Sequence, residues 1–242
     1  MIDRRTVYQP ASAQEQFIVP LLANRIAAAL ERFAAPSAKG RKVLDVGCGG
    51  QPLRVALESM GFVYSSVDVQ QNNAETVDVI APIDGPVPES LLTRGPFDFI
   101  VCTEVLEHVA DWSACFENLT ALLAPGGRIL ITCPHFYPLH EIPFDYWRPT
   151  PYAMQFFAQR NGLKILSQEN AGDGLDVLGT ALACATPAPA SGAFFSKLIA
   201  LAFDVFRKAA FVAIRSRFIR SRVTTKGSLY LSNVVVMQRP AS

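Results

Sequence analysis

The sequence has no C-x-x-C pair, and its cysteines are few and odd in number, at positions 48, 102, 115, 133 and 184. Closely paired cysteines are typical of zinc sites and disulfide-rich secreted domains, so we expect neither. The first residues, Met1 to Arg5, have no apolar stretch behind their charges, which predicts no secretory signal. These absences predict a reducing, cytoplasmic environment and cysteines that pack as small hydrophobic residues.

A large charge of one sign is also missing. The 22 lysines and arginines nearly balance the 21 acids, which gives a formal net charge of +1 in 242 residues. This excludes a globally basic surface, and we expect no nucleic-acid partner. The balance is uneven along the chain, because residues 194–226 contain eight cations and one acid. That segment therefore carries +7 and the rest of the chain −6.

Two common phosphate-binding loops are absent. There is no G-x-x-x-x-G-K-[ST] sequence, and Pro52 stands where a dinucleotide fingerprint has its last glycine. The chain instead has an apolar run at 43–46 that leads into a glycine-rich turn at 47–50. This pattern predicts a buried strand that turns sharply into a helix, with Pro52 in the first turn and the glycine backbone close to a ligand.

Further apolar runs alternate with helical segments. A first helix is expected over about 14–33, and strands near 43–47, 62–68, 76–80, 97–102, 127–133, 163–169 and 229–237. Such alternation predicts an α/β fold with a mostly parallel, doubly wound sheet covered by helices on both faces. Ligands bind these sheets at the carboxyl ends of the strands.

Several motifs lie at those strand ends. Asp45, Gly47 and Gly49 form a D-x-G-x-G motif, and Asp68 follows roughly 20 residues later at the end of the second strand. Residues 97–109 form an apolar strand followed by a Glu-His pair, and a P-G-G turn lies at 125–127. In this order the motifs resemble those of class I S-adenosylmethionine (SAM) methyltransferases of the type 11-like group, whose fourth motif is similar to 97–109. The resemblance covers about 40–170 and implies a Rossmann-like, seven-stranded sheet whose last strand is antiparallel.

The same resemblance implies which residues bind SAM. Those of the first motif should surround the methionine part, and Asp68 should accept the ribose hydroxyls. Thr103 and Glu104 should form the floor of the site, and Asp84 lies in a loosely aligned stretch near the adenine. The SAM-binding candidates are Asp45, Gly47, Cys48, Gly49, Asp68, Asp84, Thr103 and Glu104. Gln51 departs from the third glycine often found in this loop, so the fine shape of the loop should differ there.

The proline-rich segment 134–152 is predicted to be a loop on the acceptor side of the cofactor. All three histidines of the chain, His108, His135 and His140, follow the fourth and fifth predicted strands. The string H-E-x-P-x-D-Y-W-R-x-T at 140–150 resembles a bacterial methyltransferase subgroup that accompanies enzymes of cell-surface polysaccharide and glycolipid synthesis. This resemblance implies an acceptor hydroxyl on a surface glycan, a glycolipid or a related small molecule.

A hydroxyl acceptor needs a base, and histidine titrates near neutral pH. The catalytic candidates are therefore His140 first, with Glu141 and His108. The candidates for acceptor binding are His135, Asp145, Tyr146 and Arg148. Alternatively, Asp145 and Arg148 only pin the loop by a salt bridge. No recognised metal-ligand spacing is present, so we expect no metal.

The last third of the chain contains an insertion, about 185–227, in a single domain whose core spans about 40–183 and 228–240. A linker at 185–192 precedes a predicted helix over 194–222, with a charged stripe of Lys197, Asp204, Lys208, Arg215 and Arg222. This helix could cover the active site, pair two subunits of a homodimer, or lie on the inner membrane surface with its cations toward anionic headgroups.

Two alternative functions stay open: a SAM-binding sensor or partner protein without turnover, and a methyltransferase of a lipid quinone-like molecule.

Overall fold

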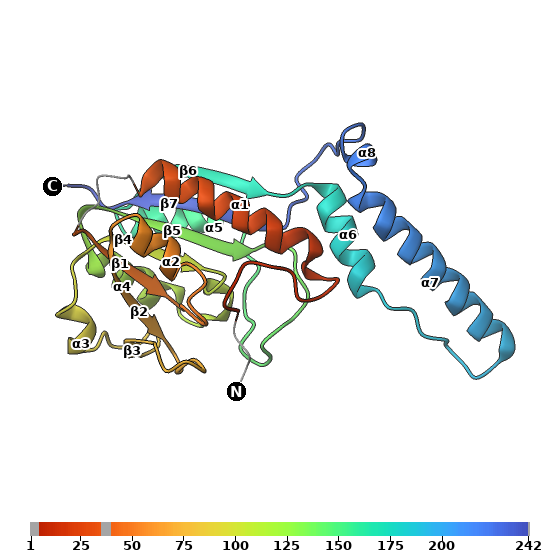
Figure 1. The fold of residues 1–242 in the computed structure, drawn as a ribbon, viewed down its shortest axis with the longest axis horizontal. Helices are drawn as coiled ribbons and strands as arrows, with labels where there is room; N and C mark the ends of the chain where they lie inside the picture. The colour runs from red at the N-terminus through yellow and green to blue at the C-terminus, as the bar shows by residue number, and fades with distance from the viewer. Residues whose placement is uncertain (1–4, 35–39, 242) are drawn as a thin grey trace.

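The computed structural model describes residues 5–34 and 40–241, so most of the segment that argued against a secretory signal lies outside it. Seven strands form one sheet in the order β3-β2-β1-β4-β5-β7-β6, and only β7 runs antiparallel to its neighbours (Figure 1). The strands are β1 Lys42–Val46, β2 Val63–Asp68, β3 Val79–Ile80, β4 Phe97–Thr103, β5 Leu123–Pro134, β6 Lys164–Ala171 and β7 Ser232–Gln238. The predicted fold class, including the antiparallel last strand, is confirmed.

Helices cover both faces of this sheet. Two apolar cores result: one packs the sheet against α4 and α5, and the other packs it against α1, α2 and α6. The helices are α1 Glu15–Phe33, α2 Arg54–Ser59, α3 Glu89–Leu92, the 3-10 helix η1 Leu106–His108, α4 Trp112–Leu122, α5 Pro151–Arg160, α6 Gly174–Cys184, α7 Phe194–Arg215 and α8 Arg217–Arg220. Because both faces are covered, the central strands read as continuous apolar runs.

The strand order reverses between β1 and β4, which pair with each other in parallel. Loops that leave neighbouring strands in opposite directions open a crevice at this point, and it is where such sheets bind ligands. The first and fourth predicted strands end there, at Val46 and Thr103. Four of the five cysteines are buried and none is bonded to another, as the sequence predicted.

The insertion differs from its prediction in one respect. The single helix expected over 194–222 ends at Arg215, because Ser216 takes an extended conformation (φ −63°, ψ 126°) before the short α8. Arg222 therefore lies outside α7, and the charged stripe loses its last member. Helix α7 packs along α6, and the pair projects from the sheet as an arm (Figure 1).

Salt bridges fix the base of this arm. Arg220 of α8 contacts Asp173 at 3.1 Å and Asp176 at 2.8 Å. These two acids form the capping box at the start of α6. These salt bridges therefore join α8, which follows the arm, to the start of α6, just after β6.

Candidate functional site

A cavity of about 520 Å³ opens at the carboxyl ends of β1 and β4. Its lining combines the glycine-rich loop with the acceptor-side loop that the sequence predicted, and the first turns of α1 close it with Ile18, Val19 and Leu22. Among the predicted site residues, the lining includes Asp45, Gly47, Cys48, Gly49, Thr103, Glu104, His108, His140 and Glu141. The two predicted halves of the site therefore meet in one space.

The first position of the glycine-rich loop, Gly47, accommodates only glycine. Gly47 has a φ of 64°, and a Cβ there would lie 2.3 Å from a methyl group of Val105. The backbone N–H of Gly49 donates to Asp68 Oδ2 at 2.9 Å. Asp68 is buried beside the loop and does not line the cavity, so in this structure it orders the loop that faces the cavity.

Gln51 keeps the conformation that a third glycine would have. Its φ is 58°, in the left-handed region. The side-chain amide holds it there by donating to Ser66 Oγ at 3.1 Å and to the Thr76 carbonyl at 2.9 Å. The expected change in loop shape is thus offset by side-chain hydrogen bonds. Pro52 lies just before α2, which begins at Arg54 rather than at the proline.

Two carboxyl groups line the cavity in a poorly solvated setting. Burial raises the pKa of Asp45 to about 7, although the Tyr64 hydroxyl donates to it at 2.7 Å. Burial likewise raises the pKa of Glu104 to about 7, against hydrogen bonds from Thr132 and Ser232. Glu104 also has a positive φ of 54°, a strained conformation of the kind that clusters at functional sites.

Asp84 is the SAM-binding candidate that the cavity does not include. Its carboxylate accepts a hydrogen bond from the Asp111 backbone N–H at 3.2 Å, next to the start of α4. In this structure Asp84 therefore braces the loop before α4.

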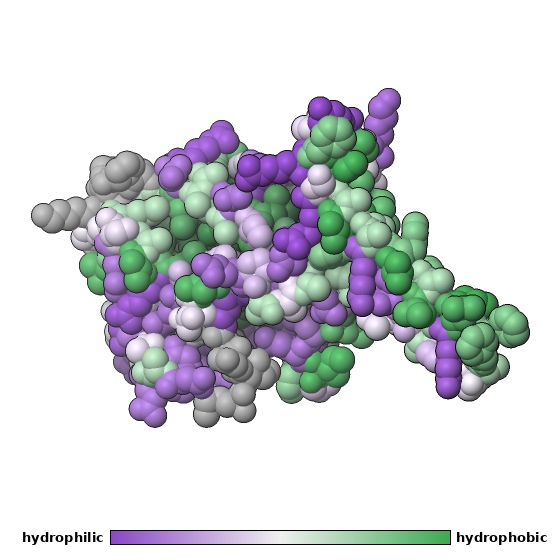
Figure 2. All heavy atoms as spheres, turned by 45° about the vertical axis from the view of Figure 1, so that its right-hand side comes forward, coloured by the Kyte–Doolittle hydropathy of each residue, from purple (hydrophilic) through white to green (hydrophobic). Residues whose placement is uncertain are grey.

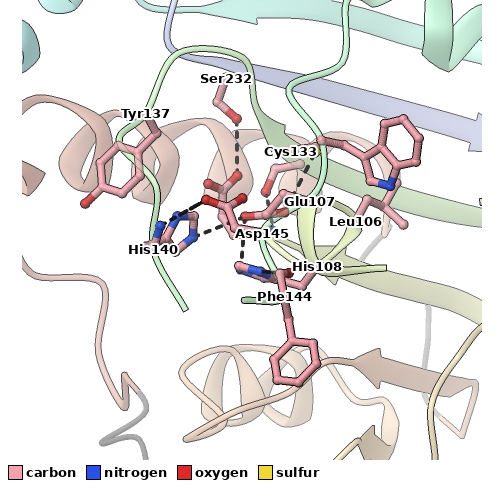
Figure 3. A network of polar contacts seen from close by, with 12 residues as sticks. Leu106, Glu107, His108, Cys133, Tyr137, His140, Phe144, Asp145 and Ser232 are labelled. Atoms are coloured by element: carbon pink, nitrogen blue, oxygen red, sulfur yellow. Dashed lines mark hydrogen bonds and ion pairs between the residues drawn. The ribbon is translucent and has the colours of Figure 1, made fainter. Parts of the chain in front are cut away.

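A carboxylate and two imidazoles meet on the acceptor side of the cavity (Figure 3). Glu107 is fully buried on η1, and its Oε1 atom accepts no hydrogen bond within the described part of the chain. The Nε2 atoms of His108 and His140 each lie 3.8 Å from that oxygen. Burial raises the pKa of Glu107 well above its usual range. Burial, and then the neighbouring His108, lower the pKa of His140.

The other ring nitrogens of both histidines face backbone carbonyls. His108 Nδ1 lies 2.9 Å from the Phe144 carbonyl, and His140 Nδ1 lies 3.2 Å from that of Pro138. Carbonyls only accept, so both Nδ1 atoms carry the proton in neutral imidazole. Each Nε2 lone pair therefore faces the cluster.

This arrangement has the donor set of a divalent cation site. One ligand atom from each of Glu107, His108 and His140 lies within 4.8 Å of the others. Imidazoles that donate Nδ1–H to a carbonyl and offer Nε2 are typical of metal ligands. No metal was expected from the sequence, because His140 is far from the Glu-His pair along the chain and no recognised ligand spacing joins them.

Asp145 and Arg148 hold the acceptor-side loop together. They form a two-pronged pair with distances of 2.6 and 2.7 Å. Arg148 also donates to the carbonyls of Tyr137 and Pro138. Burial would raise the pKa of Asp145, but the hydrogen bonds from Arg148 lower it to about 2. The geometry favours the alternative in which this pair pins the loop.

The other two acceptor-binding candidates also lie outside the cavity lining. His135 stacks on Tyr230 at 4.3 Å, and its Nδ1 lies 2.9 Å from the Pro149 carbonyl. Tyr146 donates its backbone N–H to the Glu107 carbonyl, and its side chain faces solvent. Both stabilise the loop in this structure, and their contact with an acceptor stays a prediction.

The sequence missed two parts of the site. The segment before α1 forms a wall of the cavity, and the Tyr8 hydroxyl lies 3.0 Å from Thr103 Oγ1. No periodicity marks this segment. Glu107 was noted as part of a motif and not as a site residue, although its place beside His108, just after the fourth predicted strand, was the available signal.

Comparison with known proteins agrees with this geometry. A family model described as a methyltransferase domain matches residues 20–170. A ubiquinone biosynthesis O-methyltransferase of Caulobacter sp. (strain K31) is 35% identical over 102 residues, which is 38% of this chain and 40% of the relative. The chain thus matches less than half the length of that relative.

Solved structures share the fold at low identity. A SAM-dependent methyltransferase from Archaeoglobus fulgidus aligns with a TM-score of 0.51 and 15% identity, over 93% of this chain and 97% of the other. The phosphoethanolamine N-methyltransferase 2 of Haemonchus contortus, solved with SAM, gives 0.52 and 17%, over 90% and 52%. The family match spans more than half of the chain. The chain therefore belongs to the methyltransferase domain family, which confirms the SAM-dependent methyltransferase that its motifs predicted.

Proposed function

We propose that this protein transfers the methyl group of SAM to a hydroxyl oxygen of an apolar, aromatic small molecule of the quinone-precursor type. The observation that carries the proposal is the single cavity, which joins the SAM loop to the imidazoles of His108 and His140. Methyl transfer from a sulfonium is an in-line displacement, so alignment of the acceptor oxygen, methyl and sulfur supplies much of the rate. A cavity lined by both sets of residues can provide that alignment.

The acceptor oxygen must lose its proton as it attacks. His140 is suited to this role, because its lowered pKa keeps the imidazole neutral at physiological pH. Its Nδ1–H is held by the Pro138 carbonyl, which leaves the Nε2 lone pair as the basic site. Glu107 Oε1 lies 3.8 Å from this Nε2 atom, and the raised pKa of Glu107 favours an uncharged carboxyl group beside the neutral imidazole. His108 and Glu141, which also line the cavity, would position the acceptor.

A specific observation favours a second mechanism at the same place. The buried Glu107 Oε1 atom has no hydrogen-bond donor, yet it faces two imidazole lone pairs. A divalent cation would satisfy all three atoms and would lower the pKa of a bound hydroxyl directly. In that case His140 is a ligand and not a base.

The type of acceptor is argued from the cavity wall and from the relatives. Ile18, Val19 and Leu22 form an apolar wall, which suits an aromatic ring better than a sugar. The relatives' names include ubiquinone biosynthesis O-methyltransferases, which support the quinone-like alternative. Nothing in the comparisons supports the surface-glycan or glycolipid acceptor that the 140–150 string implied. A sensor without turnover would need no paired imidazoles in the cavity.

The test measures release of S-adenosylhomocysteine with three acceptors: a catechol with an apolar tail, a free sugar and a glycolipid. Turnover should be fastest with the catechol, and turnover only with the sugar or glycolipid would overturn the proposed acceptor. The same assay after treatment with a chelator distinguishes the mechanisms. Unchanged turnover supports His140 as base, whereas loss that Mg²⁺, Mn²⁺ or Zn²⁺ restores supports the cation.

A further inference from the structure

Most of the apolar side of helix α7 faces solvent, whereas an amphipathic helix on the surface of a globular domain packs its apolar side on the core. Its inner side, toward α6, contains the only acid of the helix. Asp204 pairs with Arg207 at 2.7 Å, and Arg207 donates to the Leu182 carbonyl at the end of α6. Only Ile214 of the whole helix is buried. Polar contacts therefore attach the middle of this helix to α6, while its C-terminal end packs on the core through Ile214 and through Phe211, whose ring lies 5.5 Å from that of Phe17.

The outer side of α7 is apolar. At about 100° per residue, the most exposed apolar side chains of α7 fall within an arc of roughly 160°. These side chains are 61 to 74% exposed and include Phe194, Phe195, Ile199, Leu201, Phe206 and Val212. Figure 2 shows apolar atoms gathered on the projecting arm. A contiguous apolar surface of this kind marks a site of contact with another apolar phase or partner.

Cations border this apolar face. Lys197, Lys208 and Arg215 are exposed and fall at one edge of the arc. Arg217, Arg222 and Lys226 follow α7 and are also exposed. Asp204 is already paired with Arg207 and Lys208, so it offers no free negative charge to a partner. The face is therefore apolar in its middle and positive at its margin.

We propose that α7 lies in the interface of an anionic lipid bilayer, with its apolar side in the acyl region and its cations among the headgroups. An amphipathic helix with aromatic residues on one side and lysine or arginine beside them binds membranes in this way. The helix lies in the plane of the surface, since no helix in residues 5–34 and 40–241 is long and apolar enough to cross a bilayer.

The positive charge of the segment around α7 favours an anionic membrane over a second copy of the chain as its partner. A symmetric dimer through α7 would bring two segments of net charge +7 together, which is unfavourable. An anionic surface is complementary to the same segment. The remainder of the chain carries −6, so attraction to such a surface is confined to the arm. The protein would then sit with its sheet domain away from the headgroups.

Vesicle flotation without SAM or acceptor tests this binding independently of the proposed function. The intact protein should float with vesicles that contain phosphatidylglycerol at low salt, and about tenfold less with phosphatidylcholine alone. The double variant Phe195→Ser/Phe206→Ser should lose most of this binding. Its matched control, Val55→Ser/Phe156→Ser, removes two exposed apolar side chains from α2 and α5 and should bind as wild type.

A second pair of variants tests the charge. Lys197→Gln/Arg215→Gln should weaken binding to the anionic vesicles, whereas Arg160→Gln/Lys164→Gln at the end of α5 and the start of β6 should not. The substituted side chains are exposed, so thermal unfolding should stay close to wild type. Failure of the folded wild type to float, or equal flotation of the Phe195→Ser/Phe206→Ser variant, would overturn the proposal. A dimer in sedimentation that the same variant dissociates, without flotation, would assign the face to a second copy.

Discussion

Replacing Asp68 with alanine should weaken SAM binding strongly without unfolding the protein. The side chain is buried at the end of β2, and its Oδ2 atom accepts the Gly49 N–H at 2.9 Å. The substitution leaves that loop donor unpaired, at about 1–3 kcal/mol. It also removes the acceptor that the family resemblance assigns to the ribose hydroxyls, at about 1.5–3 kcal/mol for each charge-assisted bond. A total loss of about 2.8 kcal/mol already corresponds to a dissociation constant about 100-fold higher than that of the wild type.

Titration calorimetry with SAM measures this effect directly. Asp98→Ala is a matched control, because Asp98 accepts the Lys42 backbone N–H at 2.8 Å but lies at the opposite end of the central strands. The control should lose some stability and keep its SAM affinity. A folded Asp68→Ala variant that binds SAM within about threefold of wild type would refute the role given to Asp68.

Three further predictions concern the cavity. His140→Ala should lower turnover about 100-fold while SAM affinity stays near wild type, and Tyr152→Ala, which removes an exposed side chain of α5 outside the cavity, should leave turnover near wild type; equal losses in both would show a general effect of the substitutions on the fold. The raised folded pKa of Asp45 favours its protonated form, so its contribution to stability is present below pH 4 and is lost as pH rises toward 7. Urea unfolding of the SAM-free protein should therefore show a smaller loss of stability between pH 4 and 8 in Asp45→Asn than in wild type, and identical pH profiles would contradict the raised pKa. Gly47→Ala should abolish SAM binding by steric conflict at a positive φ, whereas Gly192→Ala, where a Cβ meets no atom within 4 Å, should have no effect; normal SAM affinity of Gly47→Ala would count against the loop geometry.

The sheet and the SAM loop could be predicted because their signals are local. An apolar run such as 97–102 and a turn with two glycines depend on adjacent residues, and all seven strands lie where the sequence placed them, to within a few residues. The acceptor side depends on contacts between distant segments. The Tyr8 hydroxyl reaches Thr103 across 95 residues, and Glu107 faces His140 from a different loop. Neither contact leaves a pattern in a single sequence.

The structure differs from the sequence in the length of one helix, and it shows other contacts for one candidate site residue. The predicted helix over 194–222 had uninterrupted helical periodicity, but Ser216 adopts an extended conformation that ends α7 at Arg215. Arg148 was a candidate for acceptor binding, yet its guanidinium is occupied by Asp145 and by carbonyls of its own loop. Composition alone does not distinguish a substrate contact from a loop brace.

Transfer of a methyl group from SAM to an acceptor oxygen in the cavity can be measured directly. Deuterated SAM, incubated with the protein and a mixture of a tailed catechol, a glycolipid and a primary amine, tests it through mass analysis of the products. We expect a labelled methyl ether on the catechol oxygen, with an equal amount of S-adenosylhomocysteine. Label found only on the amine or the glycolipid, or tight SAM binding with no labelled product from the mixture, would contradict it.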